Sequence, residues 1–296
     1  KELLIVLLVQ SFLPLNVQRI LTEVIVHIAF YDFPQLWPQL LPSLIGNLSI
    51  DNVARSNTVL GCLNAIFKKY RHEVRSDELF LEIKHVLETF APVLSQLFKM
   101  YDSQYDQLIC TSNFDPNRIS AIEAILTGLI LLNRIFYSLN WQDLPEYFED
   151  EMKSFVQFFQ KYLTSLTYPP SLVKVLTDRA SDEQSSIDKL KTFVITNINL
   201  YAFKYSEDFP YIDSFVSLVW NIIGESGEDS RNDFLVSESM GFLEVVSKQF
   251  CNKALFEDPS SLKELVDRVI VKNILLRDCD VELFEDEPLE WIRKDV

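Results

Sequence analysis

Apolar residues recur along nearly the whole chain at the three- and four-residue spacing of an amphipathic helix. The alternation of apolar and polar residues that marks a half-buried strand is absent from the sequence. The spacing predicts an all-α protein, with helices at 1–12, 17–31, 35–48, 52–72, 78–104, 118–140, 146–166, 184–205, 211–223, 232–250 and 261–276.

A short motif recurs between these predicted helices: Asp, a bulky apolar residue and Pro. It occurs as Asp32-Phe33-Pro34, Asp143-Leu144-Pro145 and Asp208-Phe209-Pro210, with a shortened form at Asp258-Pro259. Proline fits the first helical turn, where its missing N–H costs nothing. We therefore expect each proline to open the helix that follows, each aspartate to cap that helix and each apolar residue to pack back on it.

The spacing of these junctions predicts a repeat architecture. Residues 34 and 78 are 44 positions apart, and residues 210 and 259 are 49 apart, close to the ~40–47 residues of HEAT and armadillo repeats. We expect an α-α superhelix, a HEAT/armadillo-like solenoid of antiparallel helical hairpins. It forms a single array over 1–296 with about six hairpins, a polar insertion near 167–186 and an acidic insertion near 278–293.

The charge of the chain narrows the class of partner. There are 27 basic and 43 acidic residues, a net charge of −16, which repels nucleic acid and anionic lipid and favours a basic partner. No run reaches the ~18 uninterrupted apolar residues of a membrane span, so we expect no membrane insertion. The 4 cysteines show no paired spacing and are expected to be free thiols in a reducing compartment.

The sequence offers no arrangement of residues for catalysis. It has 3 histidines, and none belongs to a His-Glu-x-x-His motif or stands near a cysteine at metal spacing. The 6 glycines form no phosphate-binding loop and no Gly-x-Ser-x-Gly elbow. We therefore predict no enzyme, no catalytic or metal-binding residue and no cofactor.

One acidic segment near the end of the chain resists a purely structural explanation. Carboxylates there surround aromatic residues, a composition that offers both charge and packing to a basic partner. The alternative is a solvated surface loop. We predict an acidic loop whose partner-binding residues are Asp280, Glu282, Phe284, Glu285, Asp286, Glu287, Trp291 and Arg293.

Several stretches resemble the CAS-type exportins of the importin-beta (karyopherin) superfamily. The sequence DFPQLWP at 32–38 is similar to a repeat junction found widely in that superfamily. The runs FKKYRHE at 67–73 and FYSLNWQDLPEYFED at 136–150 are more specific to the CAS type. The acidic segment at 281–295 resembles an insertion in a middle repeat of the same family.

This resemblance implies a nuclear transport function. The chain would be an internal fragment from the N-terminal half of a solenoid of about twenty repeats. The full protein would bind RanGTP together with importin-alpha, meet nuclear pore proteins and shuttle between nucleus and cytoplasm, with GTP entering only through bound Ran. Two alternatives stay open: another importin-beta-type receptor for a basic cargo, and a static HEAT scaffold without nucleotide control.

Overall fold

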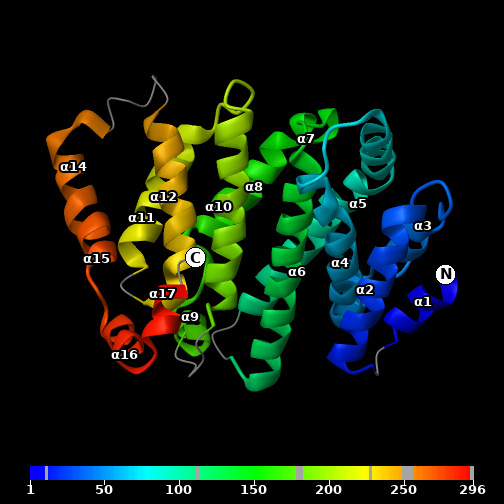
Figure 1. Cartoon of the computed structure of the whole chain (residues 1–296), viewed down its shortest axis with the longest axis horizontal. Helices are drawn as coiled ribbons and strands as arrows, with labels where there is room; N and C mark the ends of the chain where they lie inside the picture. Colours follow the sequence, from blue (N-terminus) through cyan, green and yellow to red (C-terminus); the bar gives the residue numbers. More distant parts are fainter. Residues whose placement is uncertain (11–12, 111–113, 178–182, 227–228, 249–255, 294–296) are drawn as a thin grey trace. The chain divides into compact units, whose positions relative to one another are not determined.

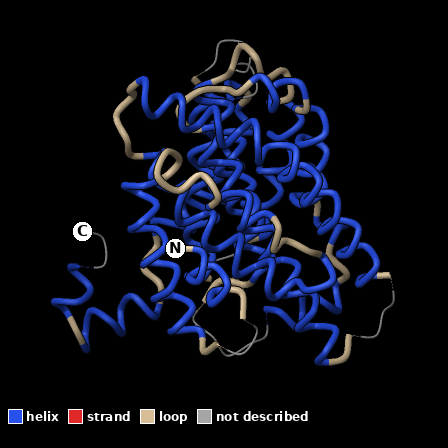
Figure 2. The backbone as a smooth tube through the Cα atoms, turned by 90° about the vertical axis from the view of Figure 1, so that its right-hand side faces the viewer, coloured by secondary structure: helices blue, strands red, loops and turns tan. Residues whose placement is uncertain are grey.

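The computed structural model describes residues 1–10, 13–110, 114–177, 183–226, 229–248 and 256–293. The chain forms two compact units, Lys1–Pro210 and Tyr211–Val296. Every regular element of the described residues is a helix, so the all-α prediction is confirmed (Figure 2). A single array of about six hairpins over the whole chain stays a prediction.

The first unit is a succession of α-helices joined by short turns and 3-10 segments. These elements are α1 (Glu2–Leu8), α2 (Leu15–Asp32), α3 (Leu40–Ile45), η1 (Ile50–Asn52), α4 (Val53–Phe67), η2 (Lys68–Arg71), α5 (Asp77–Ile109), α6 (Pro116–Asn140), α7 (Glu146–Asp150), α8 (Met152–Leu163), η3 (Ser165–Thr167), α9 (Pro170–Thr177) and α10 (Ser186–Lys204).

The second unit is also helical and includes a π-helical turn, η6. Its elements are α11 (Ile212–Glu225), η4 (Ser230–Asn232), α12 (Asp233–Ser247), α14 (Pro259–Leu265), η6 (Val266–Ile270), α15 (Val271–Ile274), α16 (Asp278–Asp286) and α17 (Pro288–Arg293). Helix α11 packs on α12 and on η6.

Helical pairs repeat through the first unit. Helix α3 contacts α4, α5 contacts α6, and α8 contacts α10. The later helix of each pair also contacts its counterpart in the next pair, so α6 lies between α4 and α10 (Figure 1). Stacked pairs bury a continuous core that no pair could form alone.

Helix α6 is the apolar centre of this stack. By length and composition it could cross a membrane, with a mean hydropathy of 1.7 in its most apolar window, and 50% of that window is buried inside the protein. Ile122, Leu126, Leu129 and Leu132 are 0% exposed. Helix α6 contacts α4, α5 and α10, so its high hydropathy is that of a core helix.

A glycine brings α5 and α6 into close contact. The ring of Tyr101 from α5 lies against Gly128 of α6, where a larger residue would meet it. The Tyr101 hydroxyl donates to Oδ1 of Asn57 over 2.9 Å, and Nδ2 of Asn57 donates to the carbonyl of Ala124 over 2.7 Å. One phenol thus joins α4, α5 and α6.

Buried amides tie α6 to α10. Nδ2 of Asn197 donates to Oδ1 of Asn133 over 3.1 Å. Farther along, the hydroxyl of Tyr201 donates to Oδ1 of Asn140 over 2.8 Å, and that of Tyr205 donates to the Asn140 carbonyl over 2.5 Å. Because buried polar groups need partners, these bonds fix how the two helices align.

The junction prolines depart from expectation at three positions. Pro34 lies in a turn ahead of α3, Pro145 immediately precedes α7, and Pro210 lies ahead of the first residue of α11. Pro259 does open its helix, α14. Proline's fixed φ and missing donor suit a turn as well as a first helical turn, and here the turn prevails.

Asp32, Asp143 and Asp208 do not cap the helices that follow them, α3, α7 and α11. Asp32 ends α2 and pairs with Lys1 across 2.6 Å, while Oδ1 of Asp143 accepts from the adjacent Leu144 N–H. Phe209 is 2% exposed, but its ring packs on Tyr201 of the preceding helix. Its packing on the following helix stays a prediction.

Other polar side chains cap four of the longer helices. Each accepts a hydrogen bond from a backbone N–H in the first turn, the arrangement that Ser, Asn and Asp favour. These caps are Asn52 for α4, Ser76 for α5, Asp115 for α6 and Ser185 for α10.

The predicted polar insertion near 167–186 contains a helix. Residues 178–182 lie outside the described part of the chain, but Pro170–Thr177 forms α9. Leu172 and Leu176, four positions apart, are 0% and 5% exposed. Pro170 fits the first turn and these leucines provide an apolar face, so this part of the predicted insertion is helical.

Candidate functional site

The acidic segment predicted as a loop is a pair of short helices, α16 and α17, in the second unit. Asp278 and Asp280 stand in the first turn of α16, where carboxylates complement the helix dipole. Oδ2 of Asp280 accepts the backbone N–H of Arg277 over 3.4 Å. Pro288 opens α17, a position that proline favours. The loop prediction is therefore wrong, and the acidic residues help to form the helices.

An ion pair fastens the start of α16 to the rest of the second unit. Nη1 and Nη2 of Arg277 lie 3.0 and 2.7 Å from the two carboxylate oxygens of Asp233, the first residue of α12. Such two-point contacts fix direction as well as distance. The segment that follows Arg277 is therefore anchored at its base.

The two predicted aromatic anchors lie together. The rings of Phe284 and Trp291 have centroids 5.3 Å apart at an interplanar angle of 78°, an edge-to-face contact that joins α16 to α17. Phe284 is 52% exposed, and Leu289 and Ile292 are 69% and 57% exposed. The segment thus presents apolar area that another molecule could bury.

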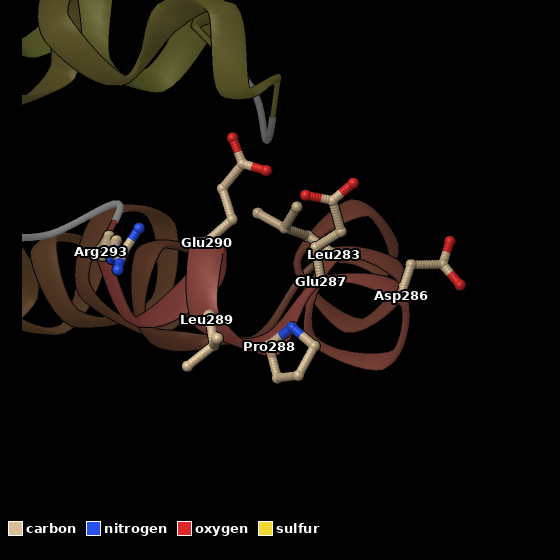
Figure 3. A pocket seen from close by; sticks show the side chains of 7 residues that line it. All are labelled: Leu283, Asp286, Glu287, Pro288, Leu289, Glu290 and Arg293. Atoms are coloured by element: carbon tan, nitrogen blue, oxygen red, sulfur yellow. The ribbon is translucent and has the colours of Figure 1, made fainter.

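The carboxylates of the segment, which include Glu290 besides the predicted residues, fall into two groups. Glu287 and Glu290 lie on the same side of the segment, and their hydrogen bond, followed by their charge repulsion, raises the pKa of Glu287 (Figure 3). Glu282, Glu285 and Asp286 are exposed on α16. Both groups add to a negative surface that is open to solvent.

A groove of about 840 Å³ lies along this surface (Figure 3). Three of the predicted site residues line it: Asp286, Glu287 and Arg293. The other five lie outside its lining: Asp280, Glu282, Phe284, Glu285 and Trp291. The lining residues are Leu283, Asp286, Glu287, Pro288, Leu289, Glu290 and Arg293.

The chemistry of this site is that of recognition. Exposed carboxylates beside exposed apolar side chains attract cations and provide apolar area to a bound partner. The described residues contain no group of three or more His, Cys, Asp or Glu arranged to hold a metal ion. The assignment of these residues to partner binding stays a prediction.

A second hollow, in the first unit, was missed from the sequence. It has a volume of about 600 Å³ and is walled by α5, the end of α6 and the start of α7. Its lining includes Leu79, Ile83, Leu87 and Tyr147, as well as Phe80, which is 64% exposed. The sequence did contain a signal for this hollow: apolar residues lie on more than one face of the helix at the start of α5.

Comparison with known proteins shows similarity along the chain. A family model described as Cse1 matches residues 66–296. Exportin-2 of Xenopus laevis is 38% identical over 284 residues, which are 96% of this chain and 28% of that protein. Exportin-2 of Homo sapiens is 37% identical over the same share of each chain. The chain thus spans 28% of the length of these curated relatives.

A solved structure has the same fold. It is described as the exportin Cse1 in its cargo-free, cytoplasmic state, and it aligns with a TM-score of 0.89 at 34% sequence identity. The alignment covers 99% of this chain and 30% of that one. The predicted HEAT-type fold is confirmed by this agreement.

Proposed function

The chain belongs to the Cse1 family, and on that premise we propose that the whole protein is the export receptor for importin-alpha. It binds importin-alpha together with RanGTP in the nucleus, carries both through the nuclear pore and releases them in the cytoplasm. The observation that supports this most strongly is agreement in sequence and fold over nearly the whole chain. The family acts as a transport receptor and not as an enzyme.

The surface on α16 and α17 supports a direct part in binding. A protein of net charge −16 attracts basic partners, and this segment adds exposed Phe284 and Leu289 to its carboxylates. Electrostatic attraction raises the rate of encounter, while apolar contact holds the bound state. We assign the segment to contact with RanGTP or importin-alpha in the complete receptor.

Coupled binding explains how transport gains direction. If RanGTP raises the affinity for importin-alpha, importin-alpha must raise the affinity for RanGTP by the same factor. Hydrolysis of GTP on Ran then weakens both interactions. The receptor itself needs no catalytic group for this cycle.

The test is retention of importin-alpha on the immobilised full-length protein. We expect strong retention with RanGTP and weak retention with RanGDP or without Ran. Equal retention under all three conditions contradicts the proposal and supports a static scaffold. Release of a bound cargo by RanGTP supports an importin that carries a basic cargo inward.

We extend the proposal to nuclear pore proteins, since a shuttling receptor must cross the pore. The apolar hollow at the start of α5 offers such proteins exposed apolar area, which includes Phe80. Movement of the tagged full-length protein between the nuclei of fused cells tests this part. A protein that stays in its original nucleus contradicts shuttling.

A further inference from the structure

A row of cations, each set over an aromatic ring, crosses the α4, α6 and α10 side of the first unit. Cζ of Arg71, at the end of η2, lies 4.9 Å from the ring centroid of Tyr137 on α6. Cζ of Arg134, also on α6, lies 5.2 Å from the ring centroid of Phe193 on α10. We call Arg71, Arg134 and Lys204 with their rings the cationic row.

Lys204 extends the row at the end of α10. Its Nζ lies 4.3 Å from the ring centroid of Trp141 and donates to the Trp141 carbonyl. The row therefore follows adjacent helices, since α6 contacts both α4 with η2 and α10 (Figure 1). Rings of this kind attract cations through their negative faces.

The groups facing these cations are mostly neutral. Nε of Arg71 donates to Oγ of Ser138 over 2.9 Å, and its Nη2 donates to the carbonyl of Arg134 over 2.8 Å. Nε of Arg134 is buried and has no hydrogen-bond partner among the described residues. The ion pairs within the described part of the chain include none of the cations of the row. Asp143 is the carboxylate that acts on Lys204 electrostatically.

The surroundings disfavour these positive charges. Burial and then the charge of Arg134 lower the pKa of Arg71, and burial lowers the pKa of Arg134. Burial and then Arg75 lower the pKa of Lys204, against the opposing effect of Asp143. The guanidinium groups remain protonated at neutral pH. An anion placed beside them would therefore be stabilised.

We propose that the cationic row binds an acidic peptide segment of a partner protein, with carboxylates at Arg71 and Arg134. Carboxylates match the planar fork of arginine, and the half-buried side chain of Arg134 forms no ion pair with a carboxylate of the described residues. The net charge of −16 opposes a long polyanion such as nucleic acid more than a short acidic peptide. This binding surface does not depend on the transport function proposed above.

The inference is tested by fluorescence anisotropy on the 296-residue chain. The probe is a fluorescein-labelled peptide of alternating Glu and Ser with a terminal Tyr, and its control carries Gln in place of Glu. We expect the Glu peptide to bind, with affinity falling as salt rises. The Gln peptide should bind at least about tenfold more weakly.

Variants locate the binding. We expect Arg134→Gln to weaken the Glu peptide about tenfold, and Arg134→Lys to recover part of that loss because it keeps the charge without the fork. Lys153→Gln makes the same charge change at an exposed position of α8 and should leave affinity within about twofold. Lys204→Gln is a second variant should Arg134→Gln fail to fold, which thermal melting will show.

Three results overturn the inference. They are equal affinity of the original chain and Arg134→Gln, equal binding of the Glu and Gln peptides, and tighter binding of a thymidine oligonucleotide than of the Glu peptide. The last result assigns the row to nucleic acid.

Discussion

The ring of Tyr101 fills the space beside Gly128 that a Cβ atom would need. Cδ1 and Cζ of the ring lie 2.6 and 2.7 Å from the position of such an atom. Tyr101 is 0% exposed and its hydroxyl is held by Asn57, so the ring has little freedom to move away. The contact between α5 and α6 therefore depends on the absence of a side chain at residue 128.

We predict that Gly128→Ala destabilises the protein by about 1–3 kcal/mol, the usual cost of overpacking a core. Chemical denaturation monitored by circular dichroism measures this change. Gly61→Ala is the matched control, because Gly61 is also helical and nothing lies within 4 Å of its Cβ position. The control should gain stability of up to about 1 kcal/mol from its higher helix propensity. Equal effects of the two substitutions would contradict the close contact.

Alkaline titration provides a second prediction. Burial is the first cause that raises the pKa of several phenols: Tyr70, Tyr101, Tyr105, Tyr162, Tyr168, Tyr201 and Tyr205. Since their pKa in the folded protein exceeds the unfolded value of about 10, the unfolded state loses protons first as pH rises. The stability they provide is complete below that value and falls as pH rises above it.

Ultraviolet absorbance of the phenolate measures this behaviour. We expect exposed tyrosines to ionise first and the buried phenols to ionise only as the helical circular dichroism is lost. A single smooth ionisation of all tyrosines in the folded protein would show that these phenols are accessible.

The cysteines provide a third prediction. Cys62 is buried, and burial raises its pKa to about 12, whereas Cys110 is exposed. Because the thiolate is the reactive form, Cys62 should not react with a disulfide reagent until the protein unfolds. Cys110→Ser should remove one fast-reacting thiol, and Cys62→Ser should remove none. Loss of a fast thiol in Cys62→Ser would contradict the burial of this side chain.

The acidic helices provide a fourth prediction. In the full-length protein, Glu285→Lys with Asp286→Lys should reduce retention of importin-alpha in the presence of RanGTP about fivefold or more, because it reverses charge at the binding surface. Phe284→Ala should also reduce retention by removing an exposed apolar anchor. Asp150→Lys, at an exposed position of α7, is the control and should bind normally. Unchanged retention in the first two variants would remove α16 from the binding surface.

Periodicity predicted most of the long helices because their apolar spacing persists over several turns. The start of α6 at Pro116 lies two residues before the predicted one, and the end of α10 at Lys204 lies one before. Short helices were missed where composition suggested a loop. Leu172 and Leu176 provide a single apolar face to α9, too little to outweigh the surrounding polar residues in a sequence pattern.

The candidate site was predicted in composition but not in geometry. Its carboxylates and aromatic residues are visible in sequence, yet the contact between Phe284 and Trp291 depends on the turn between two helices. The anchor from Arg277 to Asp233 joins residues 44 positions apart. Spacing within a helix cannot predict such a contact. The cationic row combines residues of separate hairpins in the same way.

The buried amides between α6 and α10 restrict how the first unit can move. Sliding one helix along the other by a turn would separate Asn197 from Asn133 and Tyr201 from Asn140, leaving several buried polar groups without partners. Each such loss costs about 1–3 kcal/mol. We therefore expect the hairpins that contain α6 and α10 to move together as one rigid body. Bending during a binding cycle is then expected between hairpins that lack such buried hydrogen bonds.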